Sequence, residues 1–173
     1  MQLKKFIITG GPGSGKSTTI KALSAMGYQT VDEASRIIIE EQLKEGGDIV
    51  PWKRLHEFNV VISNLQMELE SAAREGTVFL DRGIIDNLAY CEWGGIEPPN
   101  ELKKAVEKSR YDKVFLLMPL PIVNDVVRRE NQAEAEKLSG LIKKAYQSLG
   151  YEVIEVPPSA VEDRVKFIID RAL

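Results

Sequence analysis

A glycine-rich segment followed by lysine and serine comes directly after a short apolar run near the start of the chain. The letters GGPGSGKST occupy residues 10–18, and Gly10, Gly15, Lys16 and Ser17 fit the spacing G-x-x-x-x-G-K-[ST]. Glycines let the backbone turn its N–H groups toward phosphate oxygens, and the following helix adds the positive end of its dipole. The segment therefore predicts a phosphate-binding P-loop, in which Lys16 neutralises phosphate charge and the Ser17 hydroxyl contacts Mg²⁺. The alternative is a glycine-rich turn without a ligand.

Charged residues follow two later apolar runs. Glu33 is a candidate to take a proton from an attacking hydroxyl or to hold Mg²⁺ through water, whereas Asp32 is the better candidate for a helix cap. Asp81 ends an apolar run, as the second carboxylate of a P-loop metal site usually does, although an acid there could simply cap the next element. Arg82 directly after that acid favours a small-molecule kinase, because mechanical ATPases usually carry glutamate at this place.

Further polar residues are candidates for the acceptor side and for a lid. Asp86 and Tyr90 lie at helical spacing and could line an acceptor pocket, or could equally be packed or solvated. Arg128 and Arg129 suit a lid over residues 119–136 that closes on the phosphates, with a solvated basic patch as the alternative. Pro158 follows the last strand and could border the base of the nucleotide.

Five short, mostly apolar runs must position these residues. They are Lys5–Thr9, Gln29–Val31, Thr77–Leu80, Lys113–Leu117 and Glu152–Val156. Each is rich in β-branched or aromatic residues, as strands covered on both faces are, and helical patterns lie between them. The alternation predicts an α/β fold with a doubly wound parallel sheet, in which ligands bind at the carboxyl ends of the strands.

Local signals give expected boundaries for the helices. The first helix is expected over Ser17–Met26, and the longest over Pro51–Glu75 with Trp52 on its core face. Three glycines, Gly27, Gly76 and Gly150, occupy expected left-handed positions between a helix and the next strand. Ser159 is expected to form a capping box with Glu162 and to open a last helix ending near Ala172.

Length and composition limit the function classes. The 173 residues suffice for one domain over 1–173, and the net charge of −3 with a pI of about 5.4 argues against nucleic acid as a partner. No apolar stretch approaches the length of a membrane span and no signal peptide is recognised, so we expect a cytoplasmic protein. Cys91, the one cysteine, is expected to be buried filler. The oligomeric state stays open.

Taken together, these motifs resemble a family of small P-loop ATPase or kinase-like proteins. The family is related to the ribosylnicotinamide kinase domain of NadR and, more distantly, to deoxynucleoside and thymidylate kinases. The resemblance rests on GGPGSGKST and on residues 31–36, 79–83, 86–90, 110–117 and 126–130. It implies a five-stranded sheet in the order 2-3-1-4-5, Lys16 and Ser17 on phosphates and metal, Glu33 as base, and Arg128 or Arg129 in the lid. It also implies ATP with Mg²⁺, GTP being possible.

The leading hypothesis is an Mg²⁺-dependent kinase that moves the γ-phosphoryl group of ATP to a small nucleoside- or nucleotide-like acceptor. The alternatives are an NTPase without a small acceptor, which switches a partner, and a nucleotide-binding module without turnover. The candidate residues fall into four groups: catalytic, Lys16, Glu33, Asp81, Arg82, Arg128 and Arg129; nucleotide-binding, Gly11, Pro12, Gly13, Ser14, Gly15, Lys16, Ser17, Thr18 and Pro158; acceptor-binding, Glu33, Arg36, Arg82, Asp86 and Tyr90; metal-binding, Ser17 and Asp81.

Overall fold

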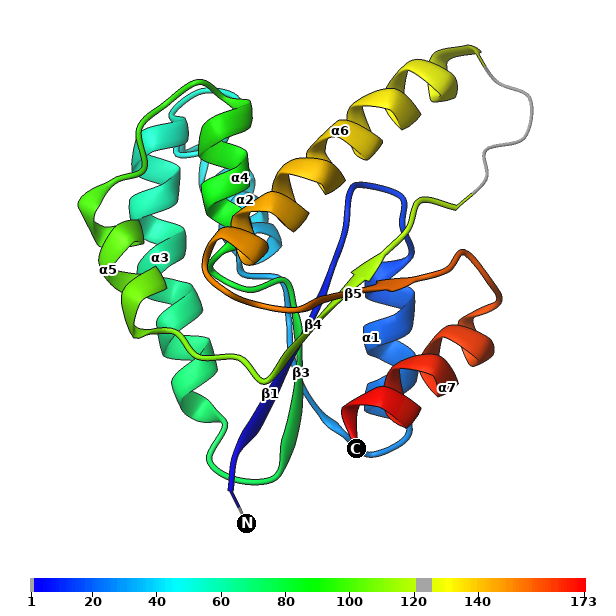
Figure 1. Ribbon diagram of the computed structural model, residues 1–173. Coiled ribbons are helices and arrows are strands. Elements are labelled where there is room, and N and C mark those ends of the chain that lie inside the picture. The colour runs from blue at the N-terminus through cyan, green and yellow to red at the C-terminus, as the bar shows by residue number, and fades with distance from the viewer. Residues whose placement is uncertain (1, 121–125) are drawn as a thin grey trace.

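A parallel β-sheet with helices on both faces organises the structure (Figure 1). The computed structural model describes residues 2–120 and 126–173, and the side chains of residues 126–131 lie outside this description. The five strands of the described chain follow the order β2-β3-β1-β4-β5. They are Lys4–Thr9 (β1), Gln29–Val31 (β2), Thr77–Asp81 (β3), Lys113–Leu117 (β4) and Val153–Val156 (β5). The expected strands, the sheet order and the doubly wound architecture are confirmed.

The helices of the described chain form two layers around this sheet. They are Lys16–Ala25 (α1), Ala34–Glu45 (α2), Leu55–Ala72 (α3), Asp86–Trp93 (α4), Asn100–Lys108 (α5), Val126–Ser148 (α6) and Val161–Ala172 (α7). Figure 1 shows α1 and α7 on one side of the sheet and α3, α4, α5 and α6 on the other. None of the described helices is long and apolar enough to cross a membrane.

Alternating strand residues build a separate core on each face of the sheet. Phe6 and Ile8 point into the core with α1 and α7, whereas Ile7 points into the core with α3, α4, α5 and α6. Because both faces are covered, β1 reads as a continuous apolar run rather than an alternating one. The free Cys91 is buried in the second of these cores, as expected for filler.

The central position of β1 brings the chemically interesting residues together. β1 pairs in parallel with β3 on one side and with β4 on the other, and Ile8 lies opposite Asp81 in the register with β3. The carboxyl ends of these strands therefore meet at one edge of the sheet, where ligands bind in open α/β sheets. The loop after β1 and the residues after β3 face each other there.

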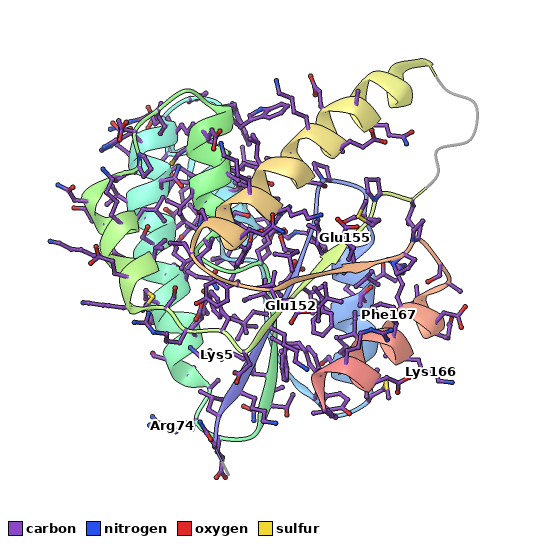
Figure 2. The ribbon with its side chains drawn as sticks, viewed as in Figure 1. Lys5, Arg74, Glu152, Glu155, Lys166 and Phe167 are labelled. Atoms are coloured by element: carbon purple, nitrogen blue, oxygen red, sulfur yellow. The ribbon has the colours of Figure 1, made fainter. Side chains whose placement is uncertain are left out.

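Helix α6 packs into the core through Leu138, Ile142 and Tyr146, and it also makes ion pairs near its carboxyl end. Lys143 pairs with Glu155 of β5, and Lys144 pairs with Glu92 of α4 at 2.8 Å. Figure 2 shows Glu155 on β5 and the labelled Lys166 and Phe167 on α7. Exposed pairs of this kind contribute about 0–1 kcal/mol each, so the buried side chains of α6 do more to hold it in place.

Several local expectations differ from the structure. The long helix begins at Leu55 rather than Pro51, and Trp52 in the preceding turn is 62% exposed instead of packed in the core. The proline and the turn before α3 break the helical spacing on which the expectation for Trp52 depended. The helix also ends at Ala72, so Gly76, although its φ is 80°, turns the chain into β3 without capping a helix.

Two helix caps are also different from those expected. Glu33, not Asp32, occupies the N-cap position of α2, and its side chain makes no capping hydrogen bond. Ala160 is the N-cap residue of α7, and the Ser159 hydroxyl bonds backbone carbonyls nearby, so the capping box with Glu162 does not form. Glu162 still lies in the first turn of α7, where its charge favours the helix dipole.

Candidate active site

The P-loop connects β1 to α1 and turns tightly around its own backbone. Gly15 precedes α1 with a φ of 83°, a left-handed conformation that favours glycine. The Ser14 hydroxyl donates to the Gly11 carbonyl at 2.9 Å, which closes the loop across three residues. No side chain caps the amino end of α1, so its N–H groups are left to bind an anion.

Two distant residues hold the P-loop in this shape. The Gly11 N–H donates to the hydroxyl of Ser139 on α6 at 2.9 Å, and a Cβ at Gly11 would lie only 2.5 Å from the Ala135 carbonyl. From the opposite face of the sheet, Arg164 of α7 donates to the Ser14 carbonyl at 2.9 Å. Arg164 is 3% exposed, and burial lowers its pKa. The loop is thus clamped between α6 and α7.

Lys16 is buried at the amino end of α1 and turned toward the loop. Its ammonium donates to the Gly11 carbonyl at 2.8 Å and lies 3.4 Å from the Ser14 hydroxyl. Burial, with the nearby Arg82 charge, lowers the pKa of Lys16 to about 7. The charged form of Lys16 is therefore disfavoured in the free protein, and a bound polyanionic ligand would stabilise it.

Ser17 and Asp81 are the residues that could hold Mg²⁺. The Ser17 hydroxyl lies 3.4 Å from Asp81 Oδ2, and Asp81 Oδ1 is buried without a hydrogen-bond partner among the described residues. Burial and the charge of Glu33 raise the pKa of Asp81 to about 6. Across the described residues, no three His, Cys, Asp or Glu side chains form a closed metal site. The pair fits Mg²⁺, which binds through one or two protein oxygens and completes its shell with phosphate and water.

Arg82 joins the P-loop to the residues after β2 and β3. Its Nε lies 3.1 Å from Glu33 Oε1, and its Nη1 donates to Asp86 Oδ2 at 3.2 Å and to the Gly10 carbonyl at 3.3 Å. Its guanidinium also stands 5.4 Å from the ring centre of Tyr90. Among the described residues other than glycine, Arg82 is the one with a positive φ, 71°. This left-handed conformation costs on the order of 1 kcal/mol. The surrounding acceptors hold it in that conformation.

Glu33 lies at the start of α2 with its carboxylate toward Arg82. The Ser35 hydroxyl also donates to Glu33 Oε1, at 2.5 Å. Burial alone would raise the pKa of Glu33, but the Arg82 guanidinium and the Ser35 hydroxyl outweigh it and lower the pKa. Glu33 is thus an ionised carboxylate at neutral pH, able to orient a hydroxyl and receive its proton.

Asp86 is packed rather than solvated. Besides Arg82, the Thr9 hydroxyl donates to its Oδ2 at 2.5 Å and the Tyr146 hydroxyl to its Oδ1 at 2.7 Å. Asp86 is 1% exposed. These contacts come from β1, α6 and the loop after β3, so Asp86 fixes the position of Arg82.

A cavity of about 170 Å³ opens beside Arg82, on the face of the sheet that carries α3 and α4. Its charged lining is Glu33, Arg82 and Asp86, and its remaining lining is Ala34, Ser35, Ile39, Pro51, Leu55, Phe58, Asn59, Ile62, Gln66, Gly83, Asn87 and Tyr90. The wall is mostly apolar, and Ser35, Asn59, Gln66 and Asn87 are its uncharged polar residues apart from Tyr90. Such a cavity next to a P-loop suits a small molecule.

The other candidate residues are placed as follows. Pro12, Gly13 and Thr18 are exposed on the P-loop and at the start of α1. Arg36 is exposed, and its guanidinium lies 4.0 Å from Glu33 Oε2. Pro158 is exposed between β5 and α7.

The expected lid lies partly outside the description. Residues 121–125 are not described, and residues 126–136 form the first turns of α6, which runs unbroken to Ser148. Arg128 and Arg129 belong to these turns, with side chains outside the described residues.

Three residues that contact the site were not predicted from the sequence. Ser139 belongs to a Leu-Ser-Gly segment with no recognisable phosphate-binding context, and Tyr146 and Arg164 lie on amphipathic helices where they look like ordinary core and surface residues. They contact the site across 128, 60 and 150 residues of chain, respectively. A buried polar position on an otherwise apolar helix face is the only local signal that any of them carries.

A parallel sheet in the order 2-3-1-4-5, with the P-loop between β1 and α1, defines the fold of the P-loop kinases. The model of the AAA_28 family, described as an AAA domain, matches residues 5–164, and the chain belongs to this family. No curated protein matches the chain in sequence.

Solved structures share the fold at low sequence identity. NadR, in complexes with NR and with NAD and AMP-PNP, is 16% identical, with TM-scores of 0.64 and 0.69 over 98% and 96% of this chain. This chain spans about half of the NadR chains, 51% and 49%. Deoxyadenosine kinase from M. mycoides is 14% identical, with a TM-score of 0.61 over 96% of this chain and 97% of that one. Thymidylate kinase from Ehrlichia chaffeensis is 13% identical, with a TM-score of 0.66 over the whole of both chains.

Proposed function

We propose that the protein is an Mg²⁺-dependent kinase that transfers the γ-phosphoryl group of ATP to a small nucleoside- or nucleotide-like acceptor. The observation that carries this proposal is the position of Arg82. Its guanidinium bonds the P-loop through the Gly10 carbonyl and the cavity wall through Glu33 and Asp86. A cation that lies between the P-loop and the neighbouring cavity can stabilise the negative charge of a phosphoryl group that moves from one to the other.

The proposed reaction forms one bond, breaks one bond and transfers one proton. An acceptor hydroxyl oxygen bonds to the γ-phosphorus, and the bond from that phosphorus to the β–γ bridging oxygen breaks. The acceptor proton moves to the Glu33 carboxylate, and the products are ADP and a phosphorylated acceptor. Phosphoryl transfer requires mainly positioning and charge stabilisation, which fits a site rich in fixed charges.

Each group around the P-loop has a separate task in this proposal. The backbone N–H groups of the loop and Lys16 bind the β- and γ-phosphates, and Arg82 stabilises charge on the transferring group. Ser17 and Asp81 would hold Mg²⁺, which when bound neutralises charge between the phosphates. Arg128 and Arg129 at the start of α6 would add charge from a lid, and Pro158 would border the base.

The names of the structural neighbours support the same assignment. NadR is seen with the ATP analogue AMP-PNP, which favours ATP, with GTP as the other candidate. NadR with NR and deoxyadenosine kinase with dCTP favour a nucleoside-like acceptor. The shared fold alone leaves the acceptor open, so it must be identified by chemistry.

The direct test is ADP release with Mg-ATP across nucleosides, nucleoside monophosphates and nicotinamide riboside, with Lys16→Ala as control. An acceptor that raises turnover above the acceptor-free rate, in the wild type and not in Lys16→Ala, supports a kinase. A uniform rate above the Lys16→Ala level would instead assign an NTPase with a macromolecular partner. A uniform rate at that level would leave a binding module without turnover.

A further inference from the structure

We propose that Arg164 of α7 is a positioning residue for phosphate binding, which orients the N–H groups of the P-loop and places an unopposed positive charge behind them. The inference rests on the proposed function and deepens its phosphate site. It is carried by the hydrogen bonds of the guanidinium, by its burial and by the lack of a carboxylate partner among the described residues.

The guanidinium of Arg164 holds two successive carbonyl groups of the P-loop. Its Nη1 donates to the Ser14 carbonyl at 2.9 Å and lies 3.4 Å from the Gly15 carbonyl, which also accepts from the Thr19 hydroxyl at 2.9 Å. The contact is close, because a side chain at Gly15 would collide with the guanidinium. Arg164 therefore reaches the loop at the point where it enters α1.

The bond to Ser14 determines where the next N–H group points. The C=O and N–H groups of a trans peptide project in opposite directions, and the described chain has no cis peptide bond. Since the Ser14 carbonyl points to Arg164, the Gly15 N–H points away from the guanidinium. That N–H has no hydrogen-bond acceptor among the described residues. It is thus available to a phosphate oxygen, as binding in a P-loop requires.

The charge of Arg164 is buried without a counter-ion. The residue is 3% exposed, and its guanidinium forms no ion pair with any described carboxylate. Its Nε also lacks a hydrogen-bond partner within the described part of the chain. Burying a cation without a paired anion is unfavourable, and a bound polyphosphate would supply the missing negative charge.

The other cations at the P-loop differ from Arg164 in this respect. Arg82 is already paired with Glu33 and Asp86, at 3.1 and 3.2 Å. Lys16 holds its proton weakly, since burial lowers its pKa to about 7. Of these three cations, Arg164 is the one whose charge is both unopposed and retained at neutral pH. Buried charges are weakly screened, so this charge favours an anion at the loop.

Inorganic tripolyphosphate with Mg²⁺ tests the inference without a base or an acceptor. Calorimetry measures its affinity for the wild type, Arg164→Lys and Arg164→Met, in which methionine removes both the charge and the donors. We expect Arg164→Met to bind about tenfold more weakly or worse, the order of effect of one buried unit charge on a nearby anion. Arg164→Lys keeps the charge but cannot hold both carbonyls, so its affinity should lie between the other two.

The matched control removes an exposed charge from the same helix. Lys166→Met, on α7 (Figure 2), should change the affinity by less than about twofold, because solvent and salt screen an exposed charge. Wild-type affinity in folded Arg164→Met, or an equal loss in Lys166→Met, would overturn the inference. If Arg164→Met does not fold, Arg164→Lys decides the matter, and wild-type affinity in that variant would overturn the inference.

A purely structural role predicts a different pattern. If Arg164 only stabilised the fold, Arg164→Lys would lower the free energy of unfolding in urea, while the folded protein kept its affinity for tripolyphosphate. In our account, the folded variant loses affinity for tripolyphosphate and for Mg-ATP alike, and the KM for the acceptor stays unchanged. An equal loss on the acceptor side would show a general effect on the site and would overturn the inference.

Binding and turnover separate this inference from the proposed function. Weaker tripolyphosphate binding in Arg164→Met, with no phosphorylated product from the wild type, would contradict the kinase and keep the role of Arg164. Phosphoryl transfer by the wild type, with equal tripolyphosphate affinity in Arg164→Met, would keep the kinase and contradict that role. A wild type that does not bind tripolyphosphate would also overturn the inference.

Discussion

Arg82 and Glu33 form an ion pair, with Nε 3.1 Å from Oε1, that joins the loop after β3 to the start of α2. The pair places the proposed transition-state cation in contact with the proposed base. It lowers the pKa of Glu33 against the effect of burial, so the carboxylate is ionised and able to receive a proton. The same contact holds Arg82 at its left-handed φ of 71°. In the proposed mechanism, this one contact therefore links the residue that stabilises phosphate charge to the residue that receives the proton.

Removing the charge of Glu33 should slow turnover while leaving nucleotide binding intact. In Glu33→Gln we expect kcat to fall by about 10²–10⁴ because the acceptor hydroxyl loses its base, with the affinity for ATP little changed. Steady-state kinetics and calorimetry check the two effects. Glu40→Gln, an exposed acid on the same helix, is the control. Unchanged turnover in Glu33→Gln would show that the base is another group.

Lysine should not replace Arg82. A lysine keeps the charge but cannot span Glu33, Asp86 and the Gly10 carbonyl together, so Arg82→Lys should lower kcat by about 10²–10³. The matched control is Arg74→Lys, which lies beside the turn into β3, away from the P-loop (Figure 2). Comparable loss in both variants would point to a general effect on the fold.

The hydroxyl of Tyr146 should matter for stability. In Tyr146→Phe, Asp86 Oδ1 loses the donor at 2.7 Å while the carboxylate stays buried, so the free energy of unfolding should fall by about 1–3 kcal/mol. Urea unfolding of the wild type, Tyr146→Phe and the half-buried Tyr151→Phe measures this. Equal stability of Tyr146→Phe and the wild type would mean that Asp86 finds another donor.

Much of the fold and part of the site could be predicted because their signals are local. The P-loop is set by the spacing of Gly10, Gly15, Lys16 and Ser17, and apolar runs of β-branched and aromatic residues mark the strands. The sheet order came from the family resemblance, and β1 lies where that order requires. Asp81 and Arg82 could be found because they lie at the end of an apolar strand, Asp81 as its last residue and Arg82 directly after it. Arg82 meets Glu33 because parallel strands end at one edge of the sheet.

What could not be predicted depends on contacts between distant segments. Ser139 and Arg164 reach the P-loop from α6 and α7, and no spacing in the chain reveals that these helices meet at Gly11 and Ser14. Trp52 shares the helical spacing of the core residues of α3, but it lies in the turn before that helix. Periodicity alone does not show where a helix begins. The donors around Asp86 likewise come from separate elements, and the pattern of residues 86–90 left its packing open.

Nucleotide affinity should depend on the protonation of Lys16. Burial and the Arg82 charge lower its pKa to about 7 in the free protein, whereas a bound triphosphate favours the charged ammonium. Binding therefore takes up a proton above neutral pH, and the dissociation constant for ATP should rise by up to about tenfold per pH unit there.

Calorimetry from pH about 6 to about 9, across the usual titration range of such a group, measures this dependence. Lys16→Arg stays protonated throughout, so its profile should be flat wherever that variant binds ATP. A flat profile in the wild type would contradict the assignment of Lys16 as the titrating group.

The most direct test of the kinase assignment follows the γ-phosphoryl group itself. Wild-type protein is mixed with γ-labelled Mg-ATP and the tightest-binding nucleoside in a single turnover, and the label is traced by mass spectrometry. The account predicts that the label appears on the acceptor in the wild type and stays on ATP in Lys16→Ala. Label found entirely in inorganic phosphate, with every acceptor tried, would contradict phosphoryl transfer and identify a hydrolase.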